Sequence, residues 1–266
     1  MGGVLSTLGV YEYIQVQMQW FKINRMPLTL ARLPRSFTGL KVVHLSDLHF
    51  NPWTTPERFS EVVEKTNQQS PDMILISGDF IDHETSLADI PAFTQLLQRL
   101  EAGLGVYAVL GNHDHWRDAD LVREMLSLSG ITNLSNRVET LNRGGEMLHL
   151  CGLDDYMEGK QDLEAVLDAL PQAGCALLLM HEPDYADISA ATGRFDLQLS
   201  GHSHGGQVDI PFYGAPIIPP YAQKYPRGLY QVNGMALYTT TGIGMVRPYV
   251  RFNCRPEIAV FTLEQA

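Results

Sequence analysis

Side chains of the types that bind metal ions recur along the chain, and nearly every one follows closely on a short apolar run. They are carboxylates, one amide and imidazoles: Asp47, His49, Asp79, Asn112, His181, His202 and His204. Divalent transition ions accept such oxygen and nitrogen ligands. A carboxylate can also bridge two ions about 3.5–4 Å apart, because it has two oxygens. The set therefore predicts a centre for two metal ions.

The spacing of these residues supports the same interpretation. Two pairs are separated by a single residue, which places both side chains on one side of an extended segment: Asp47 with His49, and His202 with His204. Glycines without a Cβ let the backbone approach the ions, and they stand at Gly78, Gly111 and Gly201. Each motif alone is common, and a lone Gly-Asp usually marks a turn. Their occurrence together and in this order favours a metal site.

The apolar runs before these clusters predict the elements that position them. The runs span residues 40–45, 73–76, 106–110, 147–151, 176–180 and 195–199. Their length is typical of strands buried on both faces. Segments with one apolar helical face lie between several of them, at residues 56–69, 90–100 and 163–170. Strands alternating with helices predict a largely parallel sheet, whose polar clusters meet at the carboxyl ends of the strands.

The composition changes after residue 207. Prolines and glycines crowd residues 211–226, and β-like runs follow at 229–232, 235–240 and 257–263. We interpret these three runs as strands of a second sheet packed on the first. Partial alternation within residues 14–30 predicts one added strand. Because no linker stands out, we expect a single domain over residues 1–266, with an N-terminal extension at 1–36 and a catalytic core at 37–266.

The ordered motifs resemble the signature of the calcineurin-like metallophosphoesterases. They are Asp47-x-His49, Gly78-Asp79-x-x-Asp82, Gly111-Asn112-His113-Asp114, His181 and Gly201-His202-x-His204. Later motifs resemble the bacterial YkuE/YaeI-like branch of that family: His204-Gly-Gly-Gln-Val208, Gly214-Ala-Pro216, Arg251-Phe-Asn-Cys254 and Pro256-Glu-Ile258. The resemblance implies an α/β fold in which two mixed β-sheets pack as a sandwich flanked by helices.

The resemblance also implies a role for each residue. Two divalent ions, of Mn, Fe, Zn or Ni, would share the bridging Asp79. One would be held by Asp47, His49 and His204, and the other by Asn112, His181 and His202. His113 would stay off the metals as the catalytic residue that faces the substrate phosphate. The chain departs from many relatives in lacking a clear N-terminal membrane anchor or twin-arginine signal.

These residues predict a binuclear metal-dependent phosphoesterase, and more specifically a phosphodiesterase. A hydroxide held between the ions would attack phosphorus, while His113 donates a proton to the leaving group or stabilises its oxyanion. Asp114 would either orient His113 or cap the following helix. The resemblance leaves open a pyrophosphohydrolase of the UDP-acylglucosamine type that acts on a lipid precursor.

Two further alternatives come from other functional classes. A non-catalytic scaffold with this fold is disfavoured because none of the expected ligands is missing. A mononuclear metallohydrolase leaves Asn112 and the paired ligand set unexplained.

Several other residues are weaker candidates. We expect three to line the pocket, namely His83, His115 and Trp53, and we expect Arg247 to contact the substrate phosphate. Asp154 and Asp155 end a strand at the active edge, where either a site role or a turn role is consistent with the sequence. His44 and His149 fall within strand runs and are interpreted as structural histidines.

Charge is distributed unevenly along the chain. The net charge is −11, yet residues 13–46 and 210–256 contain basic residues and no acid. These segments form either two solvated faces or a basic surface for an anionic substrate or membrane. The acidic remainder argues against nucleic-acid binding.

The expected location rests on three features of the sequence. It contains no apolar stretch long enough to span a membrane and no basic start that is typical of a signal peptide. Its three cysteines are widely spaced, so they predict no disulfide framework. Met1-Gly2 with Ser6 matches a short myristoylation pattern. We expect a cytoplasmic protein, with peripheral contact to an anionic membrane as the sharper hypothesis.

Overall fold

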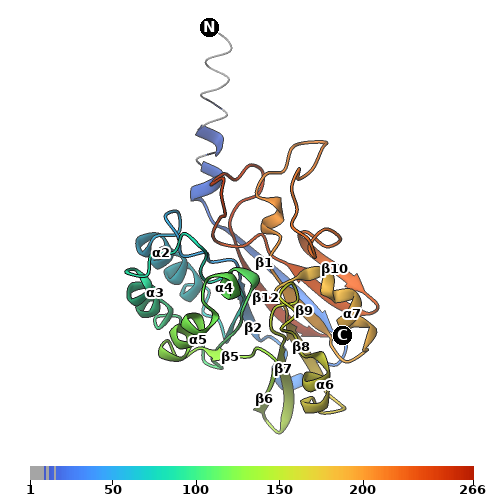
Figure 1. The fold of residues 1–266 in the computed structure, drawn as a ribbon. Helices are drawn as coiled ribbons and strands as arrows, with labels where there is room; N and C mark the ends of the chain where they lie inside the picture. The colour runs from blue at the N-terminus through green and yellow to red at the C-terminus, as the bar shows by residue number, and fades with distance from the viewer. Residues whose placement is uncertain (1–8, 10–11, 15) are drawn as a thin grey trace.

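The computed structural model describes residues 9, 12–14 and 16–266, so the myristoylation pattern lies outside the described residues. Two six-stranded sheets pack face to face, and helices cover the outer side of each sheet (Figure 1). This architecture confirms the predicted sandwich of two mixed sheets flanked by helices.

The first sheet has the strand order β1-β12-β2-β3-β4-β5. Its strands are β1 (Lys22–Leu30), β12 (Glu257–Gln265), β2 (Lys41–Leu45), β3 (Met73–Ser77), β4 (Val106–Val109) and β5 (Thr132–Asn133). β2 to β5 run parallel, whereas β12 is antiparallel to β2 and parallel to β1. The predicted N-terminal strand therefore exists and pairs with the last strand of the chain, but it begins at Lys22, and residues 14 and 16–19 of the predicted range are helical instead.

The second sheet has the order β10-β11-β9-β8-β7-β6. Its strands are β10 (Gly228–Val232), β11 (Met235–Thr239), β9 (Leu197–Ser200), β8 (Cys175–Leu179), β7 (Glu146–Gly152) and β6 (Arg137–Arg143). The four central strands are parallel, and an antiparallel hairpin closes each edge.

The boundary between the sheets differs from the sequence-based expectation. The strand at 257–263 was expected in the second sheet, but β12 lies inside the first sheet. Conversely, β7, β8 and β9 join β10 and β11 instead of extending the first parallel sheet. The sequence of a strand that is apolar on both faces does not show which sheet the strand will join, because the partner strand is distant in sequence.

Helices cover the sheets where the apolar periodicity predicted them. α2 (Pro56–Asn67), α3 (Ile90–Leu97) and α5 (Ala119–Leu128) lie over the first sheet. α6 (Leu163–Ala169) and α7 (Ala186–Ala191) lie over the second. Asp118 and Asp162 cap α5 and α6 through their side chains, and Thr55 caps α2 ahead of Pro56. The remaining elements are the short α-helix α4 (Asn112–Arg117) and three 3-10 turns, η1 (Arg35–Phe37), η2 (Pro183–Tyr185) and η3 (His204–Gly206).

The alternation of side chains along each strand separates two cores. Val42 and Phe261 face the second sheet, whereas their neighbours Val43 and Val260 face the helices. A third cluster fills the space between the second sheet and its helices. Because both faces of the central strands are buried, the strand ends and their loops are the places left for polar chemistry.

No helix in the described part of the chain is both long and apolar enough to cross a bilayer.

Phe261 lies fully buried between the two sheets and provides a test of this packing. Phe261→Ala is expected to lower the free energy of unfolding by about 3–5 kcal/mol, since it leaves a cavity at the sheet interface. Chemical denaturation measures the change. Thr262→Ala, at the exposed next position, is the matched control. Equal stability of the two variants would contradict the proposed packing.

Candidate metal centre

The predicted ligands come from loops at one end of the sandwich. Asp47 and His49 follow β2, Asp79 follows β3, and Asn112 follows β4 in the first sheet. His181 follows β8, and His202 and His204 follow β9, in the second sheet. The carboxyl ends of parallel strands from two facing sheets thus bring together residues more than 150 positions apart.

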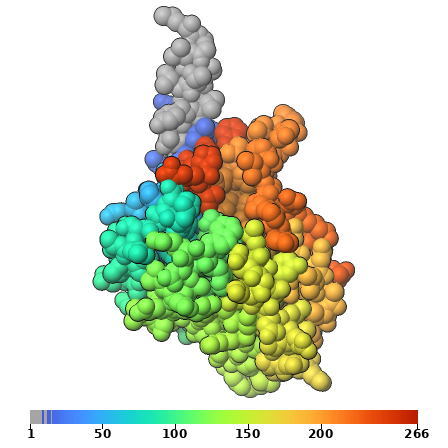
Figure 2. Space-filling model, viewed as in Figure 1, coloured from blue at the N-terminus to red at the C-terminus, as the bar shows by residue number. Residues whose placement is uncertain are grey.

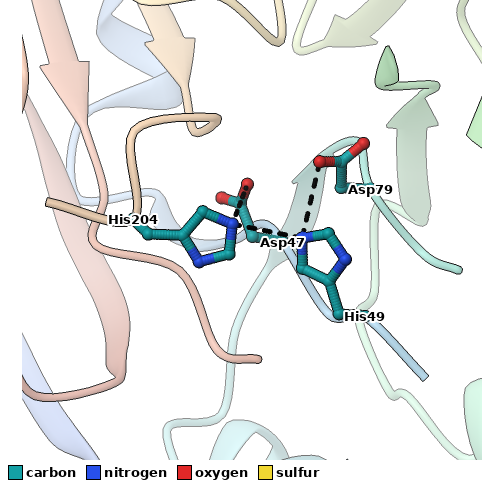
Figure 3. A group of neighbouring side chains, drawn as sticks. All are labelled: Asp47, His49, Asp79 and His204. Carbon is teal, nitrogen blue, oxygen red and sulfur yellow. Dashed lines mark hydrogen bonds and ion pairs between the residues drawn. The ribbon is translucent and has the colours of Figure 1, made fainter. Parts of the chain in front are cut away.

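Four of these residues form one cluster, which Figure 3 shows: Asp47, His49, Asp79 and His204. One candidate ligand atom from each lies within 4.8 Å of all the others. The Nε2 atoms of His49 and His204 are 3.1 Å apart. His49 Nε2 is 3.5 Å from Asp79 Oδ2, and His204 Nε2 is 3.5 Å from Asp47 Oδ1. All four side chains are buried.

A second cluster shares Asp79 with the first. It consists of Asp79, His181 and His202, again with candidate ligand atoms within 4.8 Å of one another. His181 Nε2 lies 3.2 Å from Asp79 Oδ2. Asn112 lines the same cavity as Asp79 and His202. The two clusters therefore meet at a single carboxylate, as a bridging ligand requires.

Hydrogen bonds to backbone carbonyls fix which nitrogen His181 and His202 present. His181 donates from Nδ1 to the Ser77 carbonyl at 2.6 Å, which leaves the lone pair of Nε2 free. His202 donates from Nε2 to the Pro220 carbonyl at 2.9 Å, which leaves Nδ1 free. His49 Nδ1 lies 3.5 Å from Asp82 Oδ2 and orients Nε2 toward the cluster. Such outer partners are typical of metal-binding histidines.

The residues fit a divalent metal centre by a second criterion. Asn112 Oδ1 and His181 Nε2 are buried and have no hydrogen-bond partner among the described residues. Buried polar atoms are nearly always satisfied, so these two atoms beside the Asp79 clusters are consistent with a bound cation. Nitrogen and oxygen donors together suit Mn, Fe, Zn or Ni.

The backbone around the ligands is unusual. Asp47, His49, Asp79, His202 and His204 are not glycines, yet they have φ between 43° and 65°. The left-handed region costs non-glycine residues about 1 kcal/mol or more each, and such strain is concentrated at functional sites. The conformation turns each side chain out of its strand direction and into the shared space.

Asp114 holds the bridging ligand in place. Its Oδ2 accepts hydrogen bonds from the N–H groups of Asp79 and Gly111, both at 3.0 Å. Its Oδ1 accepts from the N–H groups of Phe80 and Ile81. Asp114 therefore caps α4 and fixes the loop after β3, and no hydrogen bond joins it to the ring of His113. Of the two roles considered from sequence, capping is correct, although the helix that it caps is its own.

The neighbours of the bridging residue act on its ionisation in opposite directions. Burial opposes ionisation of Asp79, but the adjacent His181 imidazole, 3.2 Å from Asp79 Oδ2, lowers the pKa of the carboxyl well below its usual value. His113 donates its backbone N–H to Asp79 Oδ1 at 2.9 Å. Burial lowers the pKa of the His113 imidazole to about 4. The His113 ring packs edge-on against His49, with centroids 4.8 Å apart, and faces the cavity.

A cavity of about 300 Å³ adjoins both clusters, and its lining corrects several weaker expectations. His83, His115 and Trp53 do not line it. His115 is bound to Asp154 at 2.7 Å, and Trp53 packs against the guanidinium of Arg58. Trp116 does line the cavity, and sequence analysis missed it. Its position three residues after His113, on the same helix face, is the signal that could have identified it.

Arg247 lines the cavity, but its guanidinium is already paired. Both its Nε and its Nη2 lie 2.7 Å from Glu84 Oε1, which leaves its phosphate-binding role without support. His44 and His149 are hydrogen-bonded structural histidines, as predicted. Burial raises the pKa of Asp155 to about 9, with a further contribution from Glu182, and Asp155 contributes to neither cluster.

Several basic residues of the two acid-free segments are paired with acids or buried. Lys224 pairs with Asp187 at 2.7 Å and Arg227 with Asp209 at 2.6 Å. Arg32 pairs with Asp196. Arg251 is fully buried and donates to the carbonyls of Gly242 and Gly244. All three cysteines are free and buried.

Comparisons with known proteins match the part of the chain that carries all seven proposed ligands. A sequence model of the calcineurin-like phosphoesterases matches residues 40–206. The metallophosphoesterase YkuE of Bacillus subtilis is 36% identical over 98% of this chain and 92% of its own length. The phosphodiesterase YaeI of Escherichia coli is 30% identical over 96% of this chain and 89% of its own.

A solved structure supports the fold alone. TT1561 of Thermus thermophilus superposes with a TM-score of 0.51, at 12% identity, over 77% of this chain and 90% of that one.

Gly111 tests the geometry of the clusters. A Cβ at this position would overlap Asp79 Oδ1 and lie 2.8 Å from His181 Cε1. Gly111→Ala is therefore expected to displace both side chains and to reduce bound metal, as measured by elemental analysis of the folded protein. The control is Gly103→Ala, whose Cβ would meet nothing within 4 Å. Unchanged metal content in Gly111→Ala would contradict the assigned geometry.

Proposed function

Since the chain belongs to the calcineurin-like phosphoesterase family, and is thus a phosphoric ester hydrolase, we propose that it is a phosphodiesterase with a two-metal centre. The observation that carries the proposal is the pair of buried ligand clusters that share Asp79. The name of the relative YaeI supports a diester over a monoester substrate. A screen of metal-loaded protein against matched mono- and diesters tests the preference.

The proposed ligands divide between two cations. Asp47, His49 and His204 would hold one ion and Asn112, His181 and His202 the other, while Asp79 would contact both. The convergence of their donor atoms and the unpartnered atoms of Asn112 and His181 support this division. Divalent cations in such a site supply Lewis acidity, which polarises phosphoryl oxygens and makes water a better nucleophile. We propose manganese as the first ion to test.

His113 is the proposed catalytic residue. Its ring lines the cavity beside Asp79, and it makes no side-chain hydrogen bond within the described residues. It is therefore free to donate a hydrogen bond to the leaving oxygen or to a phosphoryl oxygen. Packing between His49 and Trp116, with ring centroids 4.8 Å away on each side, holds the ring in one orientation.

The alternatives raised from sequence receive no specific support. A scaffold would not need the ionised, fully buried Asp79 or the strained ligand loops. A mononuclear hydrolase would leave the second cluster without a role.

The proposal also covers the domain organisation, the location and the partners of the protein. We propose that residues 1–266 act as a single catalytic domain in the cytoplasm, with no nucleic-acid partner. Peripheral contact with an anionic membrane also remains a proposal. The ion pairs of Lys224 and Arg227 reduce the basic charge available for it.

Removing the shared carboxylate tests the bridging role. Asp79→Asn keeps the size of the side chain and an oxygen for the His113 N–H, but it removes the charge that would hold two cations. Metal content is expected to fall from about two ions per chain to fewer than one. His202→Ala, which removes a ligand of one ion only, should retain about one. Two ions in purified Asp79→Asn would rule out the bridge.

Replacing His113 tests its part in the chemistry. His113→Ala should keep both ions and lose on the order of 10²-fold or more in kcat. The loss should be smaller for nitrophenolate esters than for alkyl esters, since a good leaving group needs less stabilisation. Steady-state kinetics with both esters measures it. An equal loss for the two would exclude a role at the leaving oxygen and leave phosphoryl contact.

A further inference from the structure

The cavity beside the metal clusters has two chemically different sides. One side consists of His113 and four of the proposed ligands, namely Asp79, Asn112, His202 and His204. The other side consists of apolar residues from two loops and one helix: Pro216, Ile217 and Pro220, then Val246 and Val250, and Trp116 of α4. A phosphate held by the clusters would therefore have an apolar surface directly next to it.

The polar side chains on the far side are already engaged. Gln207 donates to the Val246 and Pro248 carbonyls and accepts from the Val246 N–H at 2.8 Å. Ser203 accepts from the Gly205 N–H, and Arg247 is paired with Glu84. Each of these polar side chains is thus engaged at least once, and the polar groups left on this side, among the described lining residues, are the hydroxyl hydrogen of Ser203 and the outer guanidinium nitrogen of Arg247. Burying sugar hydroxyls or a base without partners is costly, whereas burying an apolar group is favourable.

The apolar wall is also connected to the metal site. Pro220, which lines the cavity, accepts the hydrogen bond of His202 Nε2 at 2.9 Å. The loop that carries Ile217 is thus held in a defined position relative to a proposed metal ligand. The segment around residues 211–221, orange in Figure 2, projects from the body of the protein. Ile217 is 74% exposed and forms the rim, so an apolar group could extend beyond the cavity.

Building on the proposed phosphodiesterase function, we propose that the substrate is a phosphodiester in which one esterified group is bulky and apolar. That group lies against Ile217, Val246, Val250 and Trp116 while its phosphate lies at the metal clusters. The cavity of about 300 Å³ accommodates an aromatic ring or a short stretch of alkyl chain beside the phosphate. Ile217 and Trp116 are then specificity-determining residues.

A series of diesters with one leaving group tests the proposal on the metal-loaded protein. The substrates are p-nitrophenyl esters of methyl, butyl, hexyl and phenyl phosphate and of thymidine 5′-phosphate. We expect kcat/KM to rise by up to about fourfold for each buried methylene and to level off when the chain passes the rim. The hexyl and phenyl arms distinguish an alkyl from an aryl group. The thymidine ester should be a poorer substrate than the hexyl ester.

A direct binding measurement accompanies the kinetics. Alkylphosphonates of increasing length cannot be hydrolysed, and calorimetric titration should give a Kd that falls with chain length in the same proportion. Ile217→Ser should reduce the ratio of hexyl to methyl kcat/KM several-fold. Phe212→Ser, at the same loop but outside the cavity lining, is the matched control and should preserve the ratio.

The outcomes separate this inference from the function on which it rests. Hydrolysis of the esters with no dependence on chain length, or a preference for the thymidine ester, would overturn the inference alone. So would an equal effect of Ile217→Ser and Phe212→Ser. Failure to hydrolyse any of the diesters would refute the phosphodiesterase function itself.

Discussion

The carboxylate of Asp114 accepts four backbone hydrogen bonds, from Asp79, Phe80, Ile81 and Gly111. Through them it joins the loop after β3 to the start of α4, and so places Asp79 between the other ligands. Asp79 accepts the His113 N–H in return, which sets the catalytic candidate beside the bridging carboxylate. One buried acid that belongs to neither cluster thus fixes the loop of Asp79 and the start of α4, which carries Asn112 and His113.

The two halves of the site lie on different sheets and need a direct connection. The His202 N–H donates to Asp47 Oδ1 at 3.0 Å, which links the loop after β9 to the loop after β2. On the other side of Asp47, the Gly244 N–H donates to its carbonyl, and the buried Arg251 secures that glycine loop. These contacts hold five ligands in a conformation that an isolated loop would leave, because left-handed φ values are unfavourable for Asp and His.

The sequence predicted the chemistry of the site more fully than its surroundings. The placement of all seven proposed ligands after strands was visible, because apolar runs and polar clusters are local patterns. The sheet to which β12 belongs was not predictable, since it depends on pairing between residues 259 and 44. The same limit explains the errors over His115 and Arg247. Their partners, Asp154 and Glu84, lie 39 and 163 positions away and leave no trace in the local sequence.

The position of β12 has a consequence for how the chain is made. β12 lies between β1 and β2, two strands that emerge from the ribosome more than 200 residues earlier. The first sheet cannot close before residues 257–265 have left the exit tunnel, so until then β1 lacks the strand with which it pairs. Nascent chains of this protein therefore present an unpaired, partly apolar strand near their start, which is the kind of segment that chaperones recognise.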